Sequence, residues 1–343
     1  MLFNVEQDEG ERIIAYVVPD GFSGIPRIRL ISEGADVLVC TANETRPALV
    51  AAGRHESGLC GFNIGADQLP GLAALHDLAI VDDETGLLIY RRPQEGRLRR
   101  KVLRLETHLF PLWKLDSAVR DRVQYFEMGI ERYGRESVTQ MFLLTGLDSV
   151  YLSGRILYKN FAYWIENGFE TAVILQDPYE ELAERLLLLA AAQSAGAQHL
   201  GARDSVRLQP AMNFAGQLPF HDERNLRRAL LDMPVDVADL LANPLVRQLT
   251  ASNPEDMPTG SAIAAALDML ASCTLVGLRS DPAFIRAAMG DWLDVDLSSR
   301  HLLPDFPRVP PLAAILRQTR AVDHLLEADG EVFGKFLEVY TGE

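Results

Sequence analysis

The sequence has few cysteines, no long apolar run and no excess of positive charge. Its three cysteines, Cys40, Cys60 and Cys273, lie far apart, cannot all pair and lack the spacing of a metal site, so free thiols in a reducing compartment are expected. No apolar run approaches the ~20 residues that span a bilayer. The net charge of -15 argues against nucleic acid and anionic membranes as partners.

The N-terminal segment also lacks the pattern of a secretory signal. Residues 1–14, MLFNVEQDEGERII, are acidic, whereas a signal peptide begins with basic residues that an apolar segment follows. These features together predict a cytoplasmic protein. A length of 343 residues is enough for about two domains of the usual size.

Residues 1–96 predict a small β-sandwich domain. Residues 13–18, IIAYVV, have the composition of a strand, and residues 27–30 alternate arginine with apolar residues, as half-buried strands do. Two apolar runs, 78–81 and 87–90, flank the turn-forming sequence DDETG and predict a hairpin. Short strands with turns between them are typical of a sandwich.

Residues 97–343 predict an α/β domain in which helices flank a parallel sheet. Short apolar runs that suit strands occur at 102–105, 149–152, 171–175 and 273–277. A helix is expected over residues 112–132, and the segment 196–220, rich in Gly and Gln, is expected to be a long loop. In the stretch 170–189, ETAVILQDPYEELAERLLLL, a strand, a tight turn and a helix follow one another, and ligands of α/β folds bind at such strand ends.

A basic cluster marks the boundary between the two predicted domains. It consists of Arg91, Arg92, Arg97, Arg99, Arg100, Lys101 and Arg104. A solvated linker is the ordinary interpretation of such a cluster, and an anion site for an acidic glycan is the functional alternative.

Five stretches of the second domain carry a resemblance through their order. They are SVYLSGR at 149–155, ILQDP at 174–178, NPLVRQL at 243–249, LVGL at 275–278 and LLEADGEVF at 325–333. In this order they resemble the PAPS-dependent carbohydrate sulfotransferases, in the bacterial branch of that family. The resemblance implies a P-loop-like fold in which the helix that starts after ILQDP binds the 3′-phosphate of PAPS.

The positions that the resemblance assigns to PAPS hold different residues in this chain. The segment ETHLFPLW, which begins at Glu106, has no glycine where the family has a phosphosulfate-binding loop, and GxxxxGK[ST] occurs nowhere in the chain. Gln176, Glu181 and Glu184 replace two arginines and a serine. Because a carboxylate repels a phosphate, we expect the chain to have no cofactor, with PAPS as the cofactor if sulfotransferase activity is retained.

The candidate site residues lie at or near the ends of the predicted strands. Candidates for catalysis are Glu106, His108 and Arg155, and candidates for contact with a cofactor are Lys114, Gln176 and Glu184. Arg155 stands where the resemblance implies a histidine, and Lys114 is the lysine nearest the turn after the first strand. No metal ligand set is expected.

The expected function is that of a degenerate, sulfotransferase-like protein that binds a glycan or a protein partner in surface-polysaccharide biosynthesis or modification. Two alternatives stay open. One is an active sulfotransferase, or another transferase, whose donor site is rebuilt around Lys114, Arg155 and the basic cluster. The other is a scaffold that forms a homodimer through the edge strands of its β domain. The expected partners are therefore an acidic glycan, a protein or a second copy of the chain.

Overall fold

The computed structural model describes residues 1–21, 23–144, 146–196, 200–298 and 301–342. Contacts between residues divide the chain into two compact units. Unit 1 consists of Met1–Lys101, Arg120–Glu127 and Tyr133–Leu152. Unit 2 consists of Val102–Val119, Met128–Arg132 and Ser153–Glu343.

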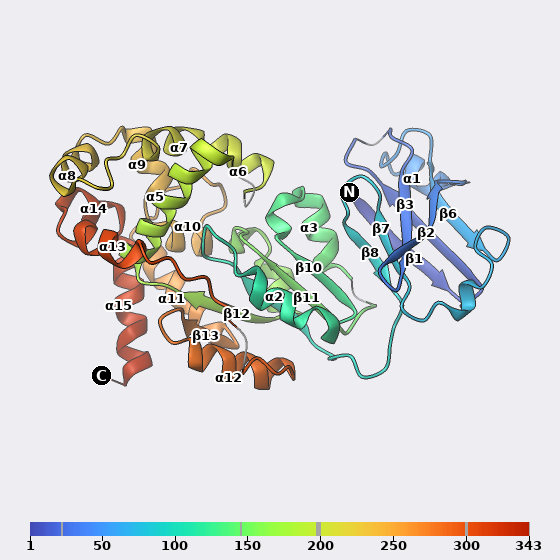
Figure 1. Cartoon of the computed structure of the whole chain (residues 1–343). Helices are drawn as coiled ribbons and strands as arrows, with labels where there is room; N and C mark the ends of the chain where they lie inside the picture. The colour runs from blue at the N-terminus through green and yellow to red at the C-terminus, as the bar shows by residue number, and fades with distance from the viewer. Residues whose placement is uncertain (22, 145, 197–199, 299–300, 343) are drawn as a thin grey trace. The chain divides into compact units, whose positions relative to one another are not determined.

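Residues 2–91 contain two four-stranded antiparallel sheets (Figure 1). The first sheet contains, in spatial order, β1 (Leu2–Asp8), β2 (Arg12–Val18), β6 (Leu59–Gly65) and β5 (Glu44–Thr45). The second contains β4 (Ala35–Thr41), β3 (Arg27–Ser32), β7 (Ala79–Asp82) and β8 (Leu88–Arg91). The short helices of this region are α1 (Pro47–Ala51) and η1 (Leu72–Ala74). The predicted hairpin is confirmed, because β7 and β8 pair with Ile80 opposite Tyr90.

Alternation of buried and exposed residues gives these sheets an apolar face. On β2, Ile13, Ala15 and Val17 are buried while Arg12 is exposed. Successive side chains of a strand point to opposite faces, so every second residue contributes to the core. On β3 the same pattern buries Ile28.

A third sheet has five parallel strands and is flanked by helices (Figure 1). Its order is β10 (Tyr125–Met128), β11 (Val150–Gly154), β9 (Lys101–Leu105), β12 (Glu170–Leu175) and β13 (Leu275–Leu278). Val173 on β12 lies opposite Leu105 on β9 and Val276 on β13. Strands covered on both faces are apolar along their whole length. The predicted parallel sheet with flanking helices, preceded by a β region, is thus confirmed.

The helix α5 (Pro178–Ala195) organises the helical part of unit 2. It packs against α7 (Gln209–Ala215) and α13 (Val309–Arg317) through a core that includes Leu182, Leu186 and Leu189. Its start agrees with the sequence, since Asp177 is the N-cap and Pro178 opens the first turn. The remaining helices are α2 (Trp113–Val119), η2 (Arg120–Arg122), η3 (Ile130–Arg132), α3 (Arg135–Phe142), η4 (Tyr158–Asn160), α4 (Ala162–Glu166), α6 (Ala202–Arg207), α8 (Glu223–Leu231), α9 (Val235–Leu241), α10 (Pro244–Thr250), α11 (Ala262–Ser272), α12 (Pro282–Leu293), α14 (Arg320–Leu325) and α15 (Glu327–Thr341).

The prediction of one helix over residues 112–132 is wrong. Helix α2 ends at Val119, and Tyr125–Met128 is strand β10. Tyr125 and Phe126 are buried aromatic residues of the kind that suits a pleated sheet. The helix was expected from the spacing of Leu115, Val119, Val123 and Phe126, and for short apolar runs periodicity alone does not separate a helix from a strand.

The prediction of one long loop over residues 196–220 is also wrong. The segment contains α6 and α7, although residues 197–199 lie outside the described part of the chain. Ala211 and Met212 of α7 are buried in the same core as α5. Tertiary packing therefore supports a helix that the local composition did not indicate.

Gly154 ends β11 at a point where η3 passes close by. A Cβ atom at this position would lie 2.7 Å from the backbone nitrogen of Ile130 and 2.5 Å from a carboxylate oxygen of Glu131. We expect Gly154→Ala to lower the free energy of unfolding by about 1–3 kcal/mol, as overpacking does. Urea denaturation measures this change.

Gly334→Ala is the matched control. Gly334 lies within α15, and a Cβ atom there would meet nothing within 4 Å. Alanine should therefore leave the stability unchanged or raise it by up to about 1 kcal/mol. If Gly154→Ala is as stable as the wild type, the close approach to η3 does not constrain the fold.

Candidate functional site

Four polar residues directly follow strands of the parallel sheet. Glu106 follows β9, Arg155 follows β11, Gln176 follows β12 and Arg279 follows β13. The carboxyl ends of parallel strands share one edge of a sheet, which is where α/β folds bind ligands. All four residues belong to unit 2, and we call this region the carboxyl edge. Sequence reasoning found the first three and missed Arg279.

The Glu106 carboxylate is buried and accepts hydrogen bonds from the turn that it begins. Oε1 accepts from the backbone nitrogen of His108 at 3.1 Å and from His108 Nδ1 at 2.8 Å. Oε2 accepts from the backbone nitrogen of Leu112 at 2.7 Å and from Arg104 Nη2 at 2.8 Å. Burial opposes the charge, but Arg104 and His108 outweigh it and hold the pKa of Glu106 well below its ordinary value. The turn therefore surrounds the negatively charged carboxylate of Glu106, which belongs to the turn itself.

Arg104 supplies the positive charge for this group from inside β9. Its Nε and Nη2 atoms donate to the two oxygens of Asp116 at 2.6 and 2.7 Å, and Ser153 Oγ donates to Asp116 Oδ2 at 2.8 Å. Bidentate pairs of this kind are strong and fix both side chains. Sequence reasoning placed Arg104 in the basic cluster at the domain boundary and did not predict its pairing with Asp116. The available signal was an arginine inside the apolar run VLRL. An arginine in a strand that is buried on both faces needs a buried carboxylate beside it.

His108 has the orientation of a general base. Glu106 holds Nδ1, while Nε2 is buried and has no hydrogen-bond partner among the described residues. A carboxylate that orients a histidine in this way leaves Nε2 to take a proton. The side chain is 1% exposed, however. A substrate would reach Nε2 only if the turn opened.

Arg155, which follows the neighbouring strand β11, holds this turn in place through hydrogen bonds. Its Nη1 donates to the backbone carbonyls of His108 at 3.3 Å and Leu109 at 3.1 Å, and its Nη2 forms an ion pair with Asp204. Burial lowers the pKa of Arg155, but Asp204 and Glu131 more than compensate and raise it. The guanidinium thus has internal partners on both sides.

The apolar side of the turn is closed by aromatic packing. The Phe110 ring lies 5.6 Å from the ring of Trp113 and 5.6 Å from that of Phe306. Lys114, the predicted contact for an anionic donor, is exposed on α2, beside the buried Leu115. The structure therefore does not bring Lys114 into the buried cluster.

The start of α5 is also satisfied by a carboxylate of the chain. Asp177 Oδ1 accepts from the backbone nitrogens of Tyr179 at 3.0 Å and Glu180 at 3.2 Å, and Arg317 Nη2 lies 2.6 Å from it. These amides are the ones that a phosphate at this helix N-terminus would use.

Arg279 lies between two of the predicted residues. Its Nη1 atom donates to Gln176 Oε1 at 2.7 Å and lies 2.7 Å from Glu184 Oε2. Glu184 is buried on α5. Burial, together with the charge of Glu181, raises the pKa of Glu184 to about 7, although Arg279 partly opposes this.

Two of the five stretches described above, residues 243–249 and 325–333, contact each other near the carboxyl edge. Asn243 Oδ1 accepts from the backbone nitrogens of Ala328 at 2.9 Å and Asp329 at 3.1 Å. Asp329 in turn accepts from the backbone nitrogens of Leu245 at 3.0 Å and Val246 at 2.8 Å. The start of α10 and the start of α15 therefore cap each other. Burial raises the pKa of Asp329 to about 6 despite these amides.

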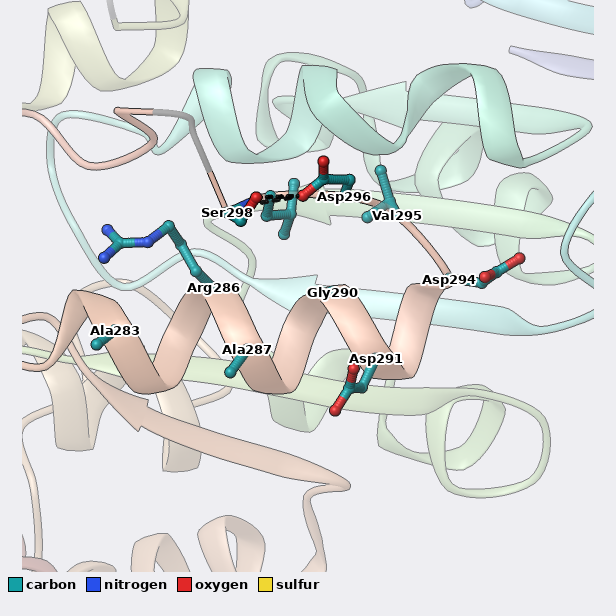
Figure 2. A pocket seen from close by; sticks show the side chains of 10 residues that line it. Ala283, Arg286, Ala287, Gly290, Asp291, Asp294, Val295, Asp296 and Ser298 are labelled. Carbon is teal, nitrogen blue, oxygen red and sulfur yellow. Dashed lines mark hydrogen bonds between the residues drawn. The ribbon is translucent and has the colours of Figure 1, made fainter.

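One cavity that the described residues form at the carboxyl edge is small. A cavity of about 20 Å³ lies between Thr107, Gln176, Glu181 and Asp329, which is room for about one water molecule. A larger groove, of about 790 Å³, runs along α12 and residues 294–298 (Figure 2). None of the predicted site residues lines that groove.

Neither a metal centre nor a membrane span is found in the described part of the chain. No group of three or more His, Cys, Asp or Glu side chains there could hold a metal ion. None of the helices there is long and apolar enough to cross a bilayer.

Comparison of the chain with models of known protein families gives no match, and comparison with curated proteins gives none either. The geometry of the carboxyl edge and the resemblance carried by the five stretches are therefore the grounds on which a function can be inferred.

Replacement of Arg104 tests the central ion pair. Arg104→Met leaves Asp116 and Glu106 buried without their cation, and we expect the free energy of unfolding to fall by about 3–5 kcal/mol. Arg99→Met is the control, because Arg99 is 84% exposed and lies 3.7 Å from Asp148, a pair that contributes little. Urea denaturation of both variants measures the difference, and equal losses would contradict the assignment.

Replacement of Glu184 tests its raised pKa. In the folded protein the Glu184 carboxyl group keeps its proton up to about pH 7, whereas in the unfolded chain it loses the proton near pH 4.5. Folding stability should therefore fall as the pH rises through this window. Glu184→Gln removes the titration, so between pH 4.5 and 7 the variant should gain about 3 kcal/mol relative to the wild type.

Urea denaturation at a series of pH values measures this difference. Glu180→Gln, on the same helix, is the control and should follow the wild-type pH profile. Parallel profiles for the wild type and Glu184→Gln would show that Glu184 is already ionised throughout the window.

Proposed function

We propose that the chain is a divergent relative of the PAPS-dependent carbohydrate sulfotransferases that does not bind PAPS. In this proposal it acts as a glycan- or partner-binding factor in surface-polysaccharide biosynthesis or modification. The observation that carries the proposal is the buried Glu106 carboxylate, which uses the hydrogen-bond donors that a phosphosulfate would need.

The phosphosulfate position that the resemblance implies lies at the turn after β9. An anion held by a turn after a strand needs backbone N–H groups and a nearby cation. The backbone nitrogens of His108 and Leu112 and the guanidinium of Arg104 already donate to Glu106. A phosphosulfate would have to displace a buried carboxylate, and an unpaired buried carboxylate costs several kcal/mol.

The 3′-phosphate position that the resemblance implies lies at the start of α5. Asp177 occupies the amides of Tyr179 and Glu180. Arg279, the buried cation at this end of β12, faces Gln176 and Glu184. The residues present therefore do not fit PAPS.

The small volume of the carboxyl-edge cavity gives little support to catalysis there. Sites for small molecules are usually clefts of about 300–1,000 Å³, whereas the cavity at the carboxyl edge measures about 20 Å³. The Glu106–His108 pair would be suited to proton transfer, but it is closed off. Transfer chemistry with a rebuilt donor site therefore has less support than binding.

Unit 1 offers a surface that suits a recognition role. A groove of about 710 Å³ is lined by planar polar side chains that include Arg12, Asn43, Glu44, Asn63 and Gln68. Arg12 Nε donates to Asn63 Oδ1 at 2.9 Å, and Asn63 Nδ2 donates to Glu44 Oε1 at 2.6 Å. Such groups can bind sugar hydroxyls. The carboxylates of this groove favour a neutral glycan over an acidic one.

The basic cluster lends little support to an acidic glycan. Arg92 forms an ion pair with Asp8 at 2.7 Å, and Arg97 Nη1 donates to the backbone carbonyl of Val123 at 2.6 Å. Arg104 is buried beside Asp116. These arginines are dispersed among internal partners and do not form one anion site.

Isothermal titration with PAPS and its desulfated product tests the proposal. We expect no binding up to millimolar concentration, because the chain's own carboxylates occupy the anion positions. A PAPS-binding sulfotransferase titrated in parallel verifies that the assay works. Micromolar binding by this chain would overturn the proposal and restore the transferase alternative.

Titration of the same protein with neutral and acidic polysaccharides completes the test. Binding of a neutral polysaccharide would support a glycan ligand for unit 1. If neither kind binds, glycan recognition is wrong and a protein partner becomes the remaining form of the proposal.

A further inference from the structure

The two antiparallel sheets of unit 1 end in four outer strands, β1, β5, β4 and β8, and the chain itself protects three of them. β1 borders α3, and Gln140 Nε2 of that helix donates to the backbone carbonyl of Phe3 at 2.8 Å. On β8, the backbone carbonyl of Leu88 accepts from the Tyr125 hydroxyl at 2.7 Å. β5 is only two residues long. These three edges therefore offer little to a further strand.

The fourth outer strand, β4, is long and open. It pairs with β3 alone. Next to it, the backbone nitrogen of Ala42 donates to the carbonyl of Pro26 at 3.0 Å, and in an antiparallel ladder such pairs recur at every second residue. The N–H and C=O groups of Val39 and Thr41 therefore point away from β3. They have no hydrogen bond to another element in the described part of the chain.

β4 has few of the features that keep an edge strand from pairing. Its sequence, ADVLVCT, contains neither proline nor lysine. A bulge at Val37 and the single charge of Asp36, which lies 3.4 Å from Arg29 of β3, interrupt only its first half. Val39 is 43% exposed, and no residue of the strand is fully buried. An exposed edge of this composition is a pairing site for another strand.

We propose that β4 pairs with the β4 strand of a second copy of the chain, in antiparallel orientation and with the two Val39 residues opposite each other. A two-fold axis between identical strands is the commonest symmetry of homo-oligomers. Val39 is the outward-facing residue nearest the middle of β4, so this register pairs the most residues. The inference does not rest on the proposed function, because the residues of the carboxyl edge take no part in it.

The charges near β4 complement each other in this register. Asp36 of one copy lies near the end of the other copy's β4, where Arg27 pairs with Thr41. The Arg27 side chain is 58% exposed and also lies 3.3 Å from Asp83, so it is available at the surface to a second carboxylate. The two Asp36 carboxylates lie at opposite ends of the paired strands, about 20 Å apart. Opposite charges thus meet between the copies and like charges do not, which favours a second copy as the occupant.

Sedimentation velocity of the full chain over a series of concentrations tests the pairing. We expect a reversible dimer of the wild type. Val39→Lys should raise the Kd of this dimer at least about tenfold, because it places two ammonium groups opposite each other. Val339→Lys is the matched control, since Val339 is 82% exposed on α15 of unit 2, and it should leave Kd unchanged. A wild type that stays monomeric up to near-millimolar concentration would overturn the proposal.

Cysteine crosslinking of the full chain tests the register. Opposed residues of a hydrogen-bonded antiparallel pair have Cα atoms about 5.5 Å apart, a distance that a disulfide spans. Under mild oxidation Val39→Cys should form a reducible covalent dimer. Thr41→Cys should not, because the two substituted positions are offset by about 13 Å along the strands. The wild type controls for Cys40 and the other native thiols, and a covalent dimer of Thr41→Cys, or none of Val39→Cys, contradicts the proposed pairing.

Discussion

The ion pair between Arg104 and Asp116 is the interaction on which the carboxyl edge depends. A guanidinium inside a strand that is covered on both faces is tolerated only with a buried, well-oriented carboxylate. Asp116 is that carboxylate, and Ser153 holds its second oxygen. Since Arg104 is fixed in this way, Glu106 has a cation beside it and stays ionised. Glu106 then arranges the turn and orients His108, so each contact depends on the one before it.

The same principle recurs where helices start at this edge. Asp177 caps α5, and Asn243 and Asp329 cap α15 and α10 in turn. Backbone N–H groups at a helix start attract anions, whether these come from a ligand or from the chain. Here the anions belong to the chain, so these helix starts are satisfied by its own side chains.

The sequence allowed most of the strands, the start of α5 and the edge that gathers the candidate residues to be predicted, because each depends on local composition. Apolar runs marked buried strands, and Asp177 with Pro178 marked a helix start. Pairings between distant residues could not be predicted in this way. Arg279 meets Gln176 across 103 residues, and Asp329 meets Leu245 across 84, and nothing in one sequence records such contacts. Strand β10 and helix α7 were missed for the related reason that packing decides their state.

The Glu106 side chain can also be regarded as a ligand that is permanently attached to its own binding site. Because Glu106 is part of the chain, the effective concentration of its carboxylate at the turn is set by the chain and not by the solution. A soluble anion would therefore compete with a group that never diffuses away and that no change in supply can dilute. The occupancy of the turn by Glu106 is therefore set mainly by the sequence and the fold, and much less by the concentration of anions in the medium.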